Sequence, residues 1–398
     1  MREHRAQGKS RFMKIALVIK EYGLERGGAE RHTVHLGRAL AQGGHDVHVL
    51  SRLFQEDPAS PPIHWHPVTT VRKPSWWKVL SFARKVSETL RHEAFDIVYA
   101  LNPVFSADIY RMSDGVQRHW LKVRYPHPLH RGARLTTRPV LLVNLYLENR
   151  LYRRGGCRRV VANSRLFKET LHGYYGVSRE RIEVIYNGVD HRTFNPQARA
   201  SLGREARARW GLPSRAPVIV FAGNDWKRKG LSTLLEAMDR RDSGSSECRL
   251  LVAGRGSPRK IERMCSPHLR SRIHLPGAVR EIQKVYAAGD LLVLPTRYDP
   301  FSNVCLEAMA CGLPVITTAA NGAAELVREG VNGYVQQEPD SAEELAGLLR
   351  RFLDGGNPES MKDAARATAS AFTWEEAARR NLELFKRLLR EKKRGIAH

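Results

Sequence analysis

The sequence predicts an α/β protein built from two Rossmann-like doubly wound domains. Apolar strand-like runs alternate with helix-like runs, and this alternation restarts near the middle of the chain. A polar stretch that contains prolines, residues 196–216, separates the halves and is predicted to be the interdomain linker. With 398 residues and 42% hydrophobic content, the chain is long and apolar enough for two cores.

The first half, residues 13–195, opens with a βαβ pattern. MKIALVI at 13–19 is a predicted strand, AERHTVHLGRALAQ at 29–42 a predicted helix, and DVHVL at 46–50 the next strand. Later strands are expected at FDIVYAL, RRVVANS and RIEVIYNG. Since a helix that joins two strands usually makes them parallel, a parallel sheet is expected.

The second half, residues 217–373, repeats the alternation. Strands are predicted at PVIVFAG, CRLLVAG, RIHLPG, LLVLP and PVITT. Residues 374–392 form an amphipathic tail, predicted as a helix. The basic residues 1–12 lack the apolar core of a signal peptide and are predicted to be a disordered tail.

Composition limits the compartment and the partners. No apolar run reaches the roughly 18–20 residues that span a bilayer. Five scattered cysteines without a C-x-x-C pair predict reduced thiols and a cytoplasmic protein, and the sixteen histidines show no familiar zinc spacing. A net charge of +25 predicts a polyanionic partner, which could be nucleic acid, an anionic membrane or a phosphorylated substrate.

Residues 289–318 carry the most informative pattern. Asp299 and Glu307 are separated by seven residues, with a short turn and the start of a helix between two apolar strands. The first N–H groups of a helix lack intrahelical acceptors and favour anions. We therefore expect the backbone of Ser302, Asn303 and Val304 to bind a diphosphate.

Two further loops follow predicted first strands. Arg228 and Lys229 lie in NDWKRKG after the strand PVIVFAG, where α/β sheets bind ligands, and are predicted to bind the diphosphate. A solvated basic turn is the alternative. Gly27 and Gly28 follow the first strand of the chain and would let a donor phosphate approach the backbone closely.

The acid pair resembles the E-x7-E motif of the family 4 retaining glycosyltransferases, with Asp299 in place of the first glutamate and EAMACGLP at the second. The resemblance implies the two-domain GT-B fold, in which a C-terminal helix crosses back to the first domain. It also implies that Asp299 and Glu307 serve catalysis, that Glu307 binds donor hydroxyls, and that Val279 and Arg280 hold the nucleobase.

The segment YRMSDGV, after the strand FDIVYAL, narrows the resemblance to the lipopolysaccharide core glucosyltransferase I group. This similarity implies a hexose donor, with UDP-glucose the best guess, and the lipopolysaccharide inner core as acceptor. Asp114 is then a catalytic candidate that contacts the acceptor hydroxyl; a core or capping aspartate is the alternative. Because no D-x-D occurs, no catalytic metal and no cofactor besides the donor are expected.

Residues 111–159 contain twelve Arg or Lys and only two acids, interleaved with Trp and Tyr. Such a segment is typical of a peripheral membrane interface, here the inner membrane; RNA binding and a core helix with a basic rim are the alternatives. The predicted interface residues are Trp120, Arg150, Arg153, Arg154, Arg158 and Arg159.

The predicted partners are therefore a nucleotide sugar, a phosphorylated glycolipid or oligosaccharide acceptor and an anionic membrane surface, with no nucleic acid expected. Two other functions remain open from the sequence. A sugar-nucleotide epimerase of the same fold would need no acceptor. A basic nucleic-acid-binding protein would bind in a salt-sensitive way and ignore nucleotide sugars.

Overall fold

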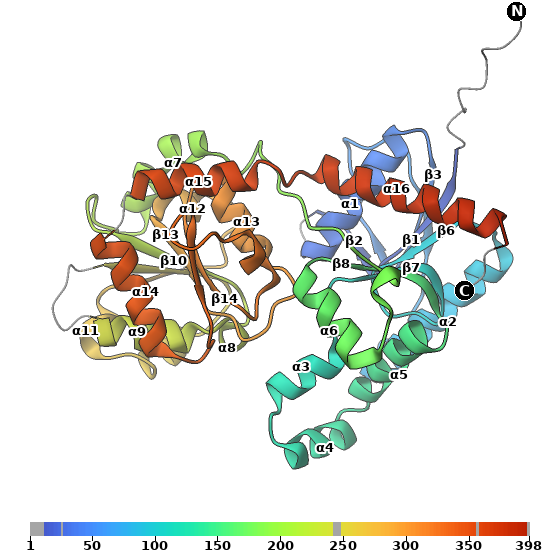
Figure 1. Cartoon of the computed structure of the whole chain (residues 1–398), viewed down its shortest axis with the longest axis horizontal. Helices are drawn as coiled ribbons and strands as arrows, with labels where there is room; N and C mark the ends of the chain where they lie inside the picture. The colour runs from blue at the N-terminus through green and yellow to red at the C-terminus, as the bar shows by residue number, and fades with distance from the viewer. Residues whose placement is uncertain (1–11, 25–26, 242–247, 356–357, 396–398) are drawn as a thin grey trace, which may run out of the picture.

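The computed structural model describes residues 12–24, 27–241, 248–355 and 358–395. It contains two large parallel sheets, each with helices on both faces, set side by side (Figure 1). This is the predicted pair of doubly wound domains. The predicted tail, residues 1–12, lies outside the described residues except for Phe12.

The first domain has a seven-stranded parallel sheet. Its order is β5 (His64–Pro67), β3 (Asp46–Ser51), β1 (Lys14–Val18), β6 (Ile97–Ala100), β7 (Ala107–Met112), β8 (Cys157–Ala162) and β9 (Ile182–Val184). Its helices are α1 (Gly28–Gln42), α2 (Ser75–His92), α3 (Gln117–Arg124), α4 (Pro128–Thr137), α5 (Pro139–Arg153), α6 (Arg165–Tyr175) and the 3₁₀ turn η1 (Arg179–Arg181). Short strands β2 (Glu21–Tyr22) and β4 (Leu53–Phe54) pair separately.

The second domain has a six-stranded parallel sheet. Its order is β12 (Ile273–Gly277), β11 (Arg249–Ala253), β10 (Val218–Ala222), β13 (Leu291–Leu294), β14 (Val315–Thr318) and β15 (Gly333–Gln336). Its helices are α7 (Pro196–Arg209), α8 (Trp226–Lys229), α9 (Leu231–Arg241), α10 (Pro258–Glu262), α11 (Pro267–Arg270), α12 (Ile282–Ala288), α13 (Asn303–Ala310), η2 (Gly322–Leu326), α14 (Ala342–Gly355) and α15 (Pro358–Ala369). β10, β13 and β14 are wholly buried, as expected of strands covered on both faces.

The last helix, α16 (Trp374–Lys393), crosses back and packs on the first domain (Figure 1). Its apolar stripe, which includes Leu384, Phe385 and Leu388, joins the core formed by β1, β3 and α1. Thr373 caps the helix through its side chain. The crossover implied by the family resemblance is confirmed.

Two segments differ from their predicted form. Strand β7 lies between FDIVYAL and Asp114, so Asp114 follows an additional strand that the sequence analysis did not resolve. Most of the predicted linker forms helix α7, which packs on α12 of the second domain. Its Arg207 donates hydrogen bonds to Ala288 O and Asp290, contacts that the polar sequence did not reveal.

Candidate active site

A cavity of about 650 Å³ lies between the domains, at the carboxyl edges of both sheets. Strand ends and helix starts converge there, which is where α/β sheets bind ligands. Predicted residues that line it are Gly28, Asp114, Trp120, Arg228, Lys229, Asp299, Ser302, Asn303 and Val304. Other lining residues were not predicted from the sequence, among them Arg31, Arg111, Gln117, Arg124 and Asn187.

Two helix N-termini meet across this cavity. Helix α13 begins at Asn303 in the second domain, and helix α1 begins at Gly28 in the first. They are so close that a Cβ on Gly28 would lie 2.7 Å from Asn303 Nδ2. Both positive helix ends therefore favour an anion between them. The N–H of Ser302 donates to Asn321 Oδ1, which leaves the amides that follow it for a ligand.

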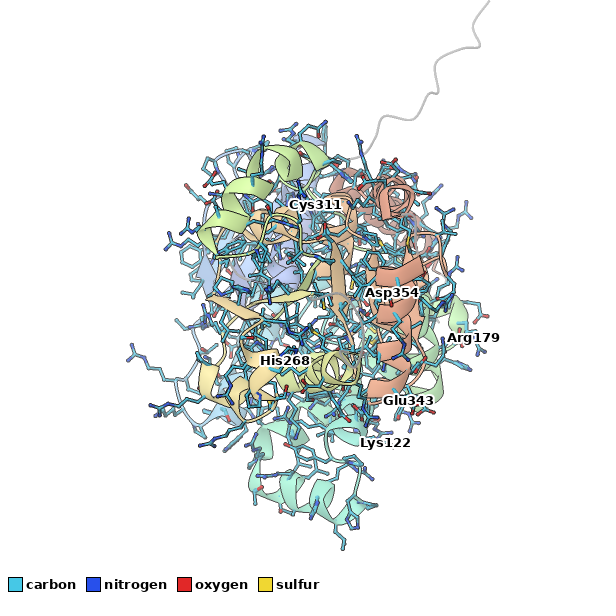
Figure 2. All side chains as sticks on the ribbon, turned by 90° about the vertical axis from the view of Figure 1, so that its left-hand side faces the viewer. Lys122, Arg179, His268, Cys311, Glu343 and Asp354 are labelled. Carbon is cyan, nitrogen blue, oxygen red and sulfur yellow. The ribbon has the colours of Figure 1, made fainter. Side chains whose placement is uncertain are left out.

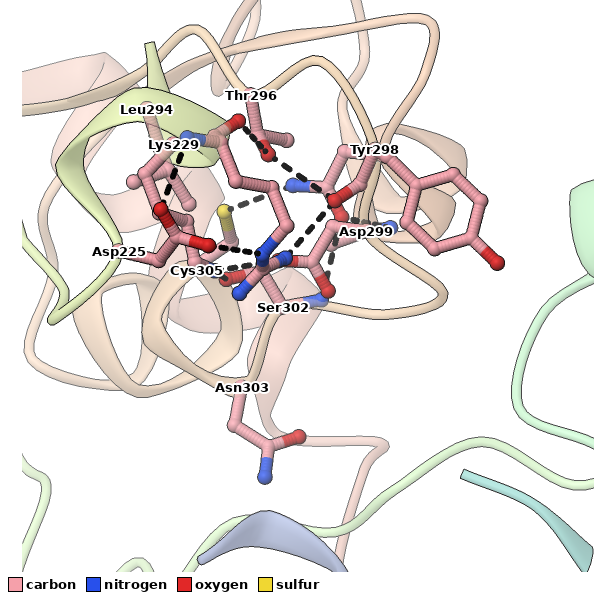
Figure 3. Close-up of polar contacts among 12 residues, drawn as sticks. Asp225, Lys229, Leu294, Thr296, Tyr298, Asp299, Ser302, Asn303 and Cys305 are labelled. Atoms are coloured by element: carbon pink, nitrogen blue, oxygen red, sulfur yellow. Dashed lines mark hydrogen bonds and ion pairs between the residues drawn. The ribbon is translucent and has the colours of Figure 1, made fainter. Parts of the chain in front are cut away.

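Both predicted cations, Arg228 and Lys229, are bonded to the carboxylate of Asp299; Figure 3 labels Lys229 and Asp299. Buried Asp299 accepts hydrogen bonds from Lys229 Nζ and, at 3.3 Å, from Arg228 Nη1. Arg228 Nη1 also donates to Tyr298 O at 2.8 Å, and Lys229 Nζ reaches Ser302 Oγ at 3.3 Å. In this geometry Asp299 orients the cations beside the start of α13.

The local chain explains this position. Asp225 caps the short helix α8 by accepting from Arg228 N, so both cations leave one tight turn (Figure 3). Gly230 follows with a φ of 79°, and a Cβ there would lie 1.9 Å from Pro295 O. Only glycine fits this left-handed position against the β13 end.

Asp114 faces the cations from the first domain. Its side chain is solvent-accessible inside the cleft, with protein on every side, and this partial burial raises the pKa of Asp114. Lys20 and Arg228 oppose that shift and favour the carboxylate. The following residues are fixed across the cleft because Tyr298 Oη accepts from Val116 N at 2.7 Å and donates to Val116 O.

Glu307 lies behind the cavity wall. It is buried and accepts hydrogen bonds from Arg31 Nη1 and Tyr286 Oη, each at 2.9 Å. Arg31 belongs to α1 of the first domain and itself lines the cavity. Glu307 thus links the domains through an ion pair, a contact that no sequence spacing could reveal.

Besides Glu307, three predicted donor-site residues do not line the cavity within the described part of the chain. Val279 packs on the second-domain core, and Arg280 is exposed in the turn between β12 and α12. Gly27 precedes α1 next to Glu30, while its neighbour Arg26 lies outside the described residues. Their roles stay predictions.

Side chains from both domains close the cleft. Asn187 Nδ2 donates to Asn303 Oδ1 and buried Arg111 donates to Asn187 Oδ1, both at 2.6 Å. Ser164 Oγ donates to Pro300 O at 2.8 Å. The segments RRVVANS and RIEVIYNG, which supply Ser164 and Asn187, were predicted only as strands.

The predicted membrane residues do not form one surface. Trp120 lines the cleft, its ring 5.3 Å from that of Tyr298, and Arg159 pairs with Glu391 of α16 at 2.7 Å. Arg150 donates to Phe105 O at 3.2 Å. Arg153, Arg154 and Arg158 are exposed. The six residues lie on different elements, α3, the end of α5 and strand β8, and their shared membrane role stays a prediction.

Helix α4 offers the more exposed basic surface. It has no buried residue and extends from the body of the molecule in both views (Figures 1 and 2). Arg134 and Arg138 are exposed, and so is Leu129, at 76%. Among the described residues, none of the helices combines the length and apolarity needed to cross a bilayer.

Family models match both domains: "Glycosyltransferase Family 4" over residues 26–193 and "Glycosyl transferases group 1" over 216–355. A D-inositol 3-phosphate glycosyltransferase of Xylanimonas cellulosilytica is 33% identical over 239 residues, 57% of this chain and 56% of the relative. An uncharacterized glycosyltransferase of Methanocaldococcus jannaschii is 25% identical and covers 94% of this chain and 98% of its own. The match to the inositol phosphate enzyme thus spans little more than half of that relative.

Solved structures share the fold. WaaG, a glycosyltransferase involved in lipopolysaccharide biosynthesis, has a TM-score of 0.77 at 22% identity, covering 93% of this chain and 99% of WaaG. Anabaena HepE in complex with UDP-glucose has a TM-score of 0.67 at 22% identity, covering 94% and 99%. The family models, the two sheets and the crossing helix agree: this chain belongs to the family 4 glycosyltransferases of the GT-B fold.

Proposed function

We propose that this chain is a retaining glycosyltransferase that moves a hexose from a nucleotide diphosphate donor to a phosphorylated saccharide acceptor. One observation carries the proposal. Lys229, Arg228 and the start of α13 form a positive wall in the second domain, and Asp114 faces it across the cavity. A diphosphate fits the positive wall, which leaves an acceptor hydroxyl beside Asp114.

The chemistry follows from that placement. The bond between the anomeric carbon and the diphosphate oxygen breaks while the acceptor oxygen bonds to the same face of the carbon. The acceptor proton passes to the departing phosphate oxygen, and Asp114 accepts a hydrogen bond from the hydroxyl. Lys229 and Arg228 stabilise the negative charge that develops on the leaving diphosphate.

UDP-glucose is the proposed donor. Its support is the fold shared with HepE, which was crystallised with UDP-glucose, and with WaaG. The lipopolysaccharide inner core is the proposed acceptor, and Arg31, Arg111 and Arg124 on the first-domain wall suit its phosphate groups. Inositol 3-phosphate, from the names of the sequence relatives, shares that phosphate chemistry.

The proposed location is the cytoplasmic face of the inner membrane. There α4 and the neighbouring α5, with exposed Leu142 and Tyr146, would contact anionic lipid.

A donor and acceptor screen tests the assignment. We expect UDP release from UDP-glucose to exceed that from other nucleotide sugars, and to rise when phosphorylated inner-core oligosaccharide is added. If inositol 3-phosphate increased UDP release more than the inner-core oligosaccharide does, inositol 3-phosphate would become the proposed acceptor. Conversion of the donor to its epimer without an acceptor, or salt-sensitive RNA binding with no donor turnover, would refute glycosyl transfer.

A further inference from the structure

A second group of polar side chains lies at the opposite, amino-terminal edge of the first sheet. Asp46 and His48 alternate along β3, and His64 and His66 alternate along β5. The strands are parallel neighbours, with His48 opposite His64 in register. Residues two apart on paired strands project from the same face, so D-x-H and H-x-H combine into one cluster.

Three ligand-type atoms in this cluster have the spacing of a metal site. Asp46 Oδ1 lies 3.0 Å from His48 Nε2 and 3.5 Å from His64 Nε2, and all three atoms are within 4.8 Å of one another. Ligand atoms around a tetrahedral Zn²⁺, with bonds near 2.0–2.1 Å, are roughly 3.3 Å apart. The two distances to Asp46 Oδ1 lie on either side of that value, and the two histidine nitrogens are within 4.8 Å of each other.

One of these atoms lacks the partner that burial requires. His48 is only 6% exposed, yet its Nε2 has no hydrogen-bond partner among the described residues, even with Asp46 at 3.0 Å. Buried polar atoms are normally satisfied. A metal ion placed to one side of the line from His48 Nε2 to Asp46 Oδ1 could accept a lone pair from each of these two atoms.

The far side of His48 is already arranged for coordination. Its Nδ1 lies 2.7 Å from His66 Nε2, a separation that indicates a hydrogen bond. His66 Nδ1 in turn faces Glu93 Oε2 at 3.5 Å, and Lys14 holds Glu93 at 2.7 Å. If His48 donates from Nδ1, its Nε2 carries a free lone pair, the tautomer that a carboxylate–histidine chain imposes on a ligand.

We propose that Asp46, His48 and His64 bind a divalent transition-metal ion of the Zn²⁺ class, with water completing the coordination. Two imidazoles and a carboxylate suit this class of ion, and His66 and Glu93 orient the buried ligand. The ion joins the short edge strand β5, most of which is exposed, to β3. It lies away from the cleft and takes no part in transfer.

Titration of the tag-free full chain with Zn²⁺, and with Co²⁺ as a spectroscopic probe, tests the site. We expect one saturable ion whose affinity falls at least about tenfold in Asp46→Asn, His64→Gln and His66→Gln. His268→Gln, at an exposed histidine of the second domain, is the matched control and should change nothing (Figure 2). Zn²⁺ should raise the Tm of the wild type but not of His64→Gln.

These variants should fold, because the side chains of Asp46 and His64 are 45% and 66% exposed. The absence of saturable binding by either metal would overturn the proposal. So would binding that survives Asp46→Asn and His64→Gln but is lost in His127→Gln/His130→Gln, a histidine pair on and beside α4 with rings 5.2 Å apart.

Discussion

The two walls of the cleft are built differently. On the second-domain wall, Asp299, Lys229 and Ser302 are buried and bonded to one another. On the first-domain wall, Asp114 and Arg124 are open to solvent inside the cavity. The second-domain wall, called the donor wall below, is therefore held by its own ion pair before any ligand binds. The first-domain wall, called the acceptor wall, combines buried, bonded Arg111 with these exposed side chains, which can adjust to a ligand.

This difference fits the proposed chemistry. A diphosphate leaving group has one shape in every nucleotide sugar of this kind, so preorganised charge suits it. Acceptors vary, and loops and exposed side chains adapt to them more readily. The comparison predicts that changes in the donor wall reduce both stability and donor binding, while changes in the acceptor wall mainly affect activity or surface binding.

Lys229→Ala should have the largest effect. It leaves buried Asp299 with only the longer Arg228 contact, and breaking a buried ion pair costs roughly 3–5 kcal/mol of unfolding free energy. UDP affinity should also fall, which calorimetry measures. Lys227→Ala, at an exposed neighbour, is the control.

A double variant separates stability from binding. Lys229→Ala/Asp299→Asn should recover much of the lost stability, because no buried charge is left unpaired, yet still bind UDP weakly. Wild-type UDP affinity in folded Lys229→Ala would contradict the comparison.

Glu148 should give the next largest effect, on the first-domain side. Burial raises its pKa to about 7, even though Tyr175 Oη and Gln117 N donate to it. Between pH 4.5 and 7 the unfolded chain has released this proton while the folded chain keeps it. Stability therefore falls as pH rises through this range, by about 3 kcal/mol.

Urea unfolding at pH 5 and pH 8 measures this effect. Glu148→Gln keeps an acceptor for Gln117 N and a donor for Tyr175, and should remove that part of the pH dependence. If the unfolding free energy changed equally with pH in wild type and Glu148→Gln, Glu148 would not be the group that titrates.

Glu307→Gln should lower kcat/KM roughly 10- to 150-fold, the cost of a lost charged hydrogen bond. Arg31→Ala is the informative partner, because it breaks the same interdomain ion pair without touching the carboxylate. A larger loss in Glu307→Gln would support direct donor contact. Because Arg31 also lines the cavity and is proposed to bind the acceptor, donor affinity is the deciding measurement. Equal losses of donor affinity would assign Glu307 a purely positioning role, and near wild-type transfer by a folded Glu307→Gln would remove it from the site.

The donor wall was largely predictable because each of its parts consists of residues that are close together in the sequence. A strand end, a turn and a helix start place Ser302 and Asn303 together, and Arg228 and Lys229 share one turn. The crossing of α16 followed from the family resemblance. The predictions for the two turns, unlike that for α16, needed only local geometry and the order of the strands.

The acceptor wall and the metal-type cluster were less predictable because they join distant segments. Arg31 pairs with Glu307, which is 276 residues away in the sequence. Trp120 of α3 lies in the cleft because its ring packs against Tyr298 of the other domain. Strand β7 was missed beside FDIVYAL. Likewise His48 and His64 become neighbours only through the pairing of β3 with β5. Their spacing in the sequence matches no zinc-binding motif.

Membrane binding should respond weakly to single charges on α4. Each cation near an anionic surface contributes about 1 kcal/mol, so Arg134→Gln should weaken liposome binding about fivefold. Arg255→Gln, exposed on the second domain, is the control. Co-sedimentation should rise with the fraction of anionic lipid and fall with salt. Equal binding to neutral and anionic liposomes, or none to either, would end the membrane proposal and leave RNA as the next partner to test.

The smallest expected effect is that of a chelator on transfer. In the donor wall the charge proposed to face the diphosphate comes from Lys229, Arg228 and the start of α13, and Asp299 is already bonded to both cations. EDTA should therefore leave kcat/KM unchanged. The same treatment of Zn²⁺-loaded protein should lower its Tm to that of His64→Gln, since the ion proposed at β3 and β5 serves stability alone. A different outcome would be that EDTA abolishes transfer and added metal restores it, in His64→Gln as well as in wild type. That result would place an ion in the cleft, and the donor wall could then not bind the diphosphate by its own charges alone.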